Sequence, residues 1–182
     1  MSTAADPEAR PAREGEIETL AADLVRAARA AGLWLGTVES CTGGLVAAAI
    51  TEVPGASHCF ERGVVTYANR AKRELVGVRA QTLEAFGAVS EPVAREMAEG
   101  LRARAPVDLV VSVTGIAGPG GSEHKPEGRV CFALAAPGQS RSWTHDFGPL
   151  GRAAVRRAAV RRALAILRAA VPAAPDDATP SD

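Results

Sequence analysis

Apolar positions recur at two different spacings along the chain, and the change between them outlines an alternation of helices and strands. From residue 16 to 31, apolar residues return every three or four positions, which predicts an amphipathic helix that Gly32 ends. Continuous apolar runs at 33–38 and 107–114 predict buried strands, and the looser alternation at 57–68 predicts a further strand. Helical spacing also predicts helices between these strands, at residues 45–50, 69–76, 81–86 and 91–104.

The C-terminal part of the chain has a different order of elements. Residues 129–135 and 140–147 predict two strands of a hairpin around a Pro137-Gly138 turn, and a long helix is predicted from Gly151 to a stop at Pro172. We expect the arginines of this last helix to form a solvated face opposite its apolar stripe, namely Arg157, Arg161 and Arg168. Strands that alternate with helices and end in a hairpin predict the α/β class: a three-layer α/β/α sandwich with a mixed sheet.

The chain has the length of one domain, 182 residues. Residues 1–15 are small, charged and proline-containing, and residues 172–182 are rich in Ala, Pro and Asp, so both ends are predicted to be disordered. We therefore expect a single domain over residues 16–171.

Composition narrows the function classes. The 21 basic and 21 acidic residues balance, so no net field favours binding to nucleic acid or to a membrane surface. The three cysteines, Cys41, Cys59 and Cys131, have neither metal-ligand spacing nor an even count, so neither a zinc site nor a disulfide framework is predicted. Free cysteines fit a reducing, cytoplasmic location. No apolar run is long enough to cross a membrane, and no signal peptide is recognisable.

The junction around Ser40 is a candidate reactive site. Ser40 and Thr42 lie between a predicted strand and the predicted helix at 45–50, where unpaired N–H groups can hold an anion or an oxyanion. Taken alone, this segment favours the simpler interpretation that Ser40 or Thr42 caps the helix, because Ser and Thr are preferred caps. Catalysis by Ser40 requires a partner from elsewhere in the chain.

A second candidate site follows the strand at 107–114. Gly115 and Gly120 have the spacing of a phosphate-binding P-loop, but Gly121 stands where that motif needs lysine, so ATP hydrolysis is not supported. The glycine amides can still cradle a phosphate or a carbonyl oxygen, which predicts a ligand loop. The alternative is a flexible connector.

The partner of Ser40 is predicted to be a lysine. The sequence around Ser40 lacks Gly-x-Ser-x-Gly, and Gly43 stands where a Ser-x-x-Lys enzyme carries its lysine. The histidines lie in dissimilar segments that suggest no triad and no metal set. Lys72 follows the strand at 57–68 closely enough for it and Tyr67 to reach the same edge of the sheet as Ser40, whereas Lys125, the other lysine, is interpreted as solvent-exposed.

Five blocks of sequence together resemble the CinA C-terminal domain family. They are Val38 to Gly44, Phe60 to Lys72, Phe86 to Val93, Ser112 to Pro119, and the Lys125-Pro126-x-Gly128 segment. The resemblance covers about residues 16–170 and is to the stand-alone form of the domain. Members of this family include nicotinamide-nucleotide amidases, which convert nicotinamide mononucleotide to nicotinate mononucleotide and ammonia.

The resemblance implies roles for particular residues. Ser40 is the nucleophile, Lys72 its general base, and Tyr67 assists in the site. The oxyanion hole is expected from the backbone amides of Cys41, Thr42 and Gly43. The pocket is expected to be lined by Thr114 and the turn from Gly115 to Gly118, with Thr114 orienting the lysine or the substrate. Arg152 is expected to contact the phosphate or the carboxamide of the substrate.

The expectation is therefore an amidohydrolase that uses no metal and no cofactor and acts on a small nicotinamide nucleotide in pyridine-nucleotide salvage. A homodimer is expected from the resemblance. The alternative is a non-catalytic module of the same fold that binds nucleotides or serves a competence-linked interaction.

Overall fold

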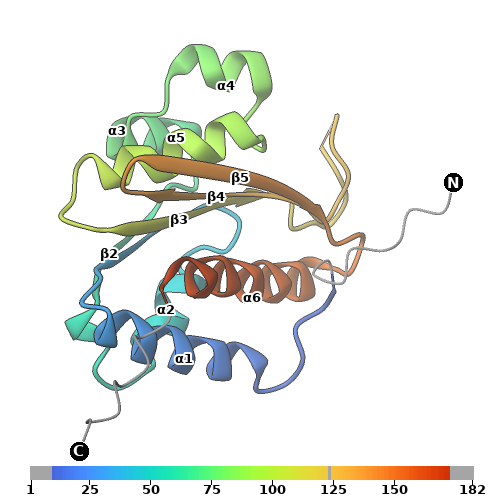
Figure 1. The fold of residues 1–182 in the computed structure, drawn as a ribbon. Coiled ribbons are helices and arrows are strands. Elements are labelled where there is room, and N and C mark those ends of the chain that lie inside the picture. Colours follow the sequence, from blue (N-terminus) through green and yellow to red (C-terminus); the bar gives the residue numbers. More distant parts are fainter. Residues whose placement is uncertain (1–9, 123, 173–182) are drawn as a thin grey trace, which may run out of the picture.

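The fold is a three-layer α/β/α sandwich, as the alternation of elements predicted (Figure 1). The structure is a computed structural model that describes residues 10–122 and 124–172. Most of each terminal segment predicted to be disordered, residues 1–9 and 173–182, lies outside the described residues.

One mixed sheet forms the middle layer, with its strands in the order β2-β1-β3-β4-β5. β1 is parallel to both of its neighbours, whereas β4 and β5 run as the predicted antiparallel hairpin. The strands are β1 (Leu35–Glu39), β2 (Phe60–Val65), β3 (Leu109–Gly115), β4 (Arg129–Ala136) and β5 (Gln139–Asp146).

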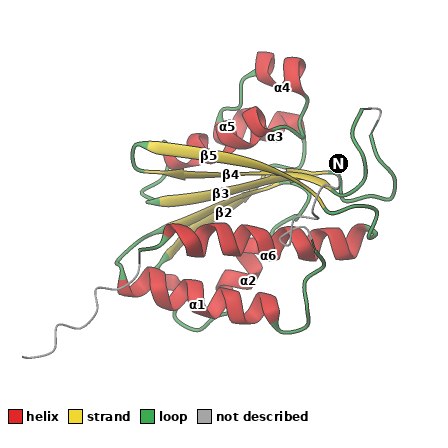
Figure 2. Cartoon of the chain, turned by 45° about the vertical axis from the view of Figure 1, so that its right-hand side comes forward, coloured by secondary structure: helices red, strands yellow, loops and turns green. Residues whose placement is uncertain are grey.

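Helices cover both faces of this sheet (Figures 1 and 2). One face carries α1 (Glu16–Ala30), α2 (Leu45–Thr51) and α6 (Arg152–Ala170). The other face carries α3 (Asn69–Val76), α4 (Ala80–Phe86) and α5 (Glu91–Arg102). Each face buries its own hydrophobic cluster, because β1 and β3 send alternate side chains to opposite sides: Val111 and Val113 pack under α6, and Val38 and Val110 under α5.

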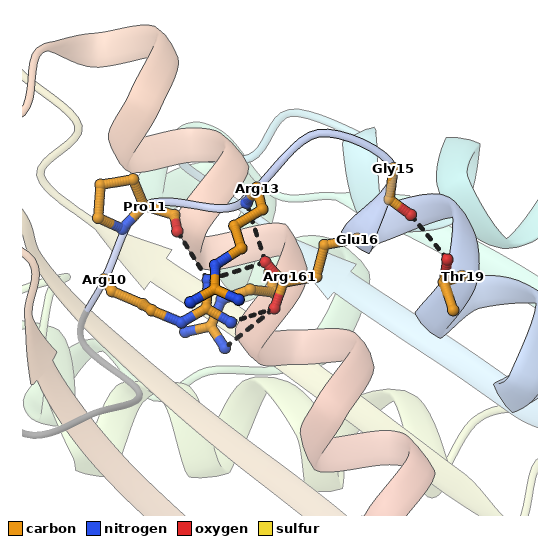
Figure 3. Close-up of polar contacts among 7 residues, drawn as sticks. All are labelled: Arg10, Pro11, Arg13, Gly15, Glu16, Thr19 and Arg161. Atoms are coloured by element: carbon orange, nitrogen blue, oxygen red, sulfur yellow. Dashed lines mark hydrogen bonds and ion pairs between the residues drawn. The ribbon is translucent and has the colours of Figure 1, made fainter.

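The prediction of a solvated arginine face on α6 is wrong for Arg161, which is only 3% exposed. Its guanidinium lies 3.9 Å from the carboxylate of Glu16 at the start of α1, and Arg10 binds the same carboxylate (Figure 3). The hydrogen bonds from Arg10 are the main reason why the pKa of Glu16 falls to about 2. Arg168 likewise pairs with Asp23 of α1, so Arg161 and Arg168 join α6 to α1.

Within the part of the chain that the structure describes, no helix is both long and apolar enough to span a lipid bilayer.

Candidate active site

The candidate active site lies at the carboxyl edge of the three parallel strands. Register pairs Glu39, the last residue of β1, with Val65 at the end of β2 and with Val113 near the end of β3. Ser40, Thr66 and Thr114 therefore emerge at one edge of the sheet, with Ser40 between the other two. This edge is where open α/β sheets bind their ligands.

The structure brings Ser40 and Lys72 together. Lys72 lies in the first turn of α3, which begins at Asn69 with Ala68 in the N-cap position. The Lys72 ammonium nitrogen Nζ donates to Ser40 Oγ at 3.0 Å and to the Thr66 carbonyl at 2.7 Å. A hydroxyl and an amine are thus in direct contact at the end of β1, which is the arrangement of a nucleophile with its base.

Burial changes the acid–base chemistry of Lys72. Its side chain is among the largest fully buried ones in the protein, and the residue is 1% exposed. Loss of hydration disfavours the charged form and lowers the pKa of Lys72 from 10.5 to about 8. A neutral amine is therefore accessible near neutral pH, which a surface lysine does not provide.

The turn from Ser40 to Gly44 uses one of the amides expected to form the oxyanion hole. The Gly43 N–H donates to the Ser40 carbonyl at 3.0 Å, so the prediction of Gly43 as an oxyanion donor is wrong. Within the described chain, the N–H groups of Cys41 and Thr42 donate to no other residue. These two amides remain the candidates to stabilise an oxyanion beside Ser40.

The helix cap predicted from Ser40 or Thr42 comes instead from Glu39, a residue that the sequence interpretation did not single out. The Glu39 carboxylate accepts the N–H groups of Gly44, Val46 and Ala47 at the start of α2. Thr42 Oγ1 is buried and has no hydrogen-bond partner in the described structure. An acidic residue at the end of an apolar strand, just before a helix, was the available sequence signal.

Cys41 is chemically quiet despite its place beside the nucleophile. Burial raises the pKa of its thiol to about 12, so it stays protonated and does not compete with Ser40. A Cβ atom at Gly115 would lie 3.0 Å from the Cys41 sulfur and 2.7 Å from a methyl group of Val130. Glycine is therefore needed where the end of β3 passes the nucleophile turn.

Tyr67 and Arg152 are brought together at the same edge of the sheet. Arg152, the first residue of α6, donates to the Tyr67 hydroxyl at 2.7 Å and to the Gly118 carbonyl at 3.0 Å. Tyr67 follows β2 and Gly118 follows β3, so this bridge joins the chain on the two sides of β1. Tyr67 is 59% exposed, which places it at the rim of the site. Its hydroxyl is bound by Arg152, whereas Lys72 donates its hydrogen bonds to Ser40 and Thr66.

The glycine-rich loop after β3 is fixed at several points. Gly118 has φ +88°, and a Cβ atom there would lie 2.5 Å from the carboxyl carbon of Glu127. That carboxylate accepts the N–H of Gly120 at 2.6 Å and the N–H of Gly151 at 3.1 Å. The loop is therefore built around its own carboxylate and joined to the start of α6, which argues against the flexible-connector interpretation.

Thr114 and Lys125 both bind the segment that joins α4 to α5. The Thr114 hydroxyl donates to the Ala88 carbonyl at 2.8 Å, and the Lys125 ammonium donates to the carbonyls of Phe86 and Val89 at 2.8 and 2.5 Å. The interpretation of Lys125 as a solvent-exposed lysine is wrong. The Thr114 hydroxyl has a single hydrogen, which it donates to Ala88, so it cannot also donate to a substrate.

Among residues 10–122 and 124–172, no three His, Cys, Asp or Glu side chains cluster as metal ligands would. The three cysteines are buried free thiols in separate parts of the chain: Cys41 follows β1, Cys59 precedes β2, and Cys131 lies in β4. Arg162 of α6 donates a hydrogen bond to His145 on β5, the strand third along the sheet from β1.

Comparison with known proteins shows that the chain matches one protein family over most of its length. Residues 17–171 match the CinA C-terminal domain. The nicotinamide-nucleotide amidohydrolase PncC of Shigella flexneri is 50% identical over 146 residues, which are 79% of this chain and 88% of that protein. A CinA-like protein of Synechococcus sp. strain CC9902 is 48% identical over 153 residues, 83% of this chain, but the match spans only 36% of that longer protein.

Solved structures show the same fold. The crystal structure of the competence/damage inducible protein CihA from Agrobacterium tumefaciens superposes with a TM-score of 0.83 at 46% sequence identity. The match covers 87% of this chain and 97% of that one.

Proposed function

Since the chain belongs to the CinA C-terminal domain family, we propose that it is a nicotinamide-nucleotide amidohydrolase acting through Ser40 and Lys72. The observation that carries this proposal is the 3.0 Å contact between Ser40 Oγ and the buried Lys72 Nζ. The substrate is nicotinamide mononucleotide, and the product, nicotinate mononucleotide, feeds pyridine-nucleotide salvage. The relatives named for this activity support the choice of substrate.

The reaction begins when neutral Lys72 accepts the Ser40 proton while Ser40 Oγ bonds to the carboxamide carbon. The carbonyl oxygen becomes an oxyanion facing the N–H groups of Cys41 and Thr42. As the tetrahedral intermediate collapses, the C–N bond breaks, and Lys72 returns its proton to the departing ammonia. A water molecule, deprotonated by the same amine, then attacks the ester carbon. The C–Oγ bond breaks, Lys72 returns this proton to Ser40 Oγ, and nicotinate mononucleotide is released.

The proposal predicts that the purified protein releases one ammonia for each nicotinate mononucleotide formed from nicotinamide mononucleotide. Because the chemistry is assigned to a hydroxyl and an amine, added EDTA is expected to leave the rate unchanged. A coupled ammonia assay with chromatography of the nucleotide measures both products. Absence of turnover would favour the non-catalytic module of the same fold instead.

We also assign to Arg152 the recognition of the substrate phosphate, because its guanidinium lies exposed at the site and needs only to exchange the Tyr67 and Gly118 oxygens for phosphate oxygens. Replacing Arg152 with glutamine is expected to raise KM for nicotinamide mononucleotide by about 10-fold or more, with little change in kcat. KM for the riboside, which lacks the phosphate, should stay the same.

The control for this prediction is Arg157→Gln, since Arg157 is exposed on the same helix. Equal effects of Arg152→Gln on the nucleotide and the riboside would refute a phosphate contact.

A further inference from the structure

Glu39 is a buried carboxylate placed immediately before the proposed nucleophile, and it is 1% exposed. Its Oε2 accepts the N–H groups of Gly44 and Val46, each at 3.0 Å, and its Oε1 accepts the N–H of Ala47 at 2.8 Å. The Thr37 hydroxyl lies 3.4 Å from Oε1. The Glu39 side chain thus bonds to the last amide of the turn, that of Gly44, and to two amides in the first turn of α2. These hydrogen bonds connect the two ends of the turn.

The backbone of the turn is also held by Arg156 of α6. Its Nε donates to the Cys41 carbonyl at 3.1 Å, and a terminal nitrogen donates to the Thr42 carbonyl at 2.8 Å. The planar guanidinium therefore hydrogen-bonds to two consecutive carbonyls of the turn at once. Arg156 is half-buried, and sequence analysis alone did not identify it as part of the site.

Two hydrogen bonds to carbonyls of the turn set the directions of the two candidate oxyanion donors. A planar trans peptide points its C=O and its N–H in opposite directions. The Ser40 carbonyl is held by the Gly43 N–H, which directs the Cys41 N–H of the same peptide to the other side. The Cys41 carbonyl is held by Arg156, which directs the Thr42 N–H in the same way. Each donor is thus set by a clamp on the carbonyl of its own peptide.

We infer that Glu39 and Arg156 are positioning residues of the amidase reaction. Arg156 holds the peptide that carries the Thr42 amide, and Glu39 holds Gly44, the neighbour of the Gly43 amide that sets the Cys41 peptide. The inference rests on the function proposed above. Glu39 acts through the backbone and does not touch the substrate, since its carboxylate faces the first amides of α2. A carboxylate is required because both of its oxygens accept hydrogen bonds, whereas one end of a glutamine side chain would present N–H groups to N–H donors.

The test compares Glu39→Gln with Glu96→Gln. Glu96 lies on α5 and has a similar capping role, accepting the backbone N–H of Arg79 at 2.9 Å and the Thr82 hydroxyl at 2.7 Å at the start of α4. Each substitution removes the acceptor capacity of a capping carboxylate, so both should lower Tm. Only the first lies at the nucleophile turn.

Two substrates separate oxyanion stabilisation from general damage: nicotinamide mononucleotide and its thioamide analogue, in which sulfur replaces the carboxamide oxygen. Sulfur is a weak hydrogen-bond acceptor, so fixed N–H donors favour the oxygen substrate. We expect Glu39→Gln to lower kcat for the amide by about 10- to 100-fold with KM within about threefold, and to lower the amide-to-thioamide ratio of kcat by about tenfold. Glu96→Gln should leave kcat and this ratio unchanged.

Other outcomes are decisive as well. If Glu39→Gln loses the same factor on both substrates, or keeps wild-type kcat, the positioning role is overturned while the proposed function stands. If the wild type itself releases no ammonia, the proposed function fails and this inference fails with it.

Arg156→Lys extends the test should Glu39→Gln not fold. A lysine keeps the charge but cannot grip both carbonyls as a fork, so the amide-to-thioamide ratio should fall in this variant too. The matched control is Arg157→Lys, on the exposed side of α6, which should keep the wild-type ratio. An unchanged ratio in Arg156→Lys would overturn the clamp.

Discussion

Replacing Ser40 with alanine is expected to lower ammonia release from nicotinamide mononucleotide by about 10⁴-fold or more, because the variant lacks the atom that attacks the carboxamide carbon. Thr42 is not expected to substitute for it, since the Thr42 hydroxyl is buried without a hydrogen-bond partner in the described structure. The fold should persist, because Lys72 keeps the Thr66 carbonyl as an acceptor. Steady-state ammonia release and a thermal unfolding curve measure both effects.

The matched control is Ser57→Ala, a substitution of an exposed serine between α2 and β2. It should retain wild-type turnover. Undiminished ammonia release by Ser40→Ala would remove Ser40 from the mechanism, whatever the behaviour of the control.

Lys72→Arg is expected to lower kcat by about 10³-fold or more. The substitution keeps the positive charge, but a guanidinium does not lose its proton at any pH of the assay and so cannot accept the Ser40 proton. In the wild type, kcat/KM should rise with pH and level off above about pH 8, because the pKa of Lys72 is lowered to about 8 and only its neutral form is a base.

The control for this prediction is Arg73→Met on the exposed side of α3, which should keep both the rate and the pH profile. Wild-type turnover by Lys72→Arg, or a wild-type profile without a rise near pH 8, would exclude the lysine as the base.

Burial of the Lys72 ammonium group also lowers the free energy of unfolding of the protein. Its folded pKa lies below its unfolded pKa, so between about pH 8 and 10.5 the unfolded chain binds more protons and the free energy of unfolding increases with pH. Below pH 8 the cost of burying the charge is fully present. The difference in unfolding free energy between wild type and Lys72→Met should therefore shift by roughly 3 kcal/mol in favour of the wild type from pH 7 to 10.5. Denaturant titrations at both pH values measure this shift, and a constant difference would contradict it.

Sequence patterns were sufficient to predict the fold. The structure contains all the predicted helices and strands, and their ends differ by a few residues at most, because the spacing of apolar positions is imposed by the geometry of each element. The largest difference is β2, predicted over residues 57–68 but formed by Phe60–Val65. A short 3₁₀ helix, Ala56–His58, precedes it, and loose alternation marks strand ends poorly.

The site was predicted only in part. The pairing of Ser40 with Lys72 could be anticipated because both follow parallel strands, and parallel strands end at one edge of a sheet. The roles of Gly43 and Lys125 could not be, because they depend on which carbonyls the folded backbone presents to them. Hydrogen bonds to backbone carbonyls produce no repeating pattern of residue types, so they cannot be predicted from the spacing of residues in the sequence.

What the sequence by itself determined is the order of the elements, the α/β class and the two residues proposed for the chemistry. Only the tertiary structure decided how the nucleophile turn is held and how far Lys72 is buried. The Glu39 contacts span five to eight residues, but those of Arg156 cross more than a hundred. Local patterns record which face of an element is apolar, whereas the pKa of a base and the direction of an amide are set by groups that meet only when the layers pack.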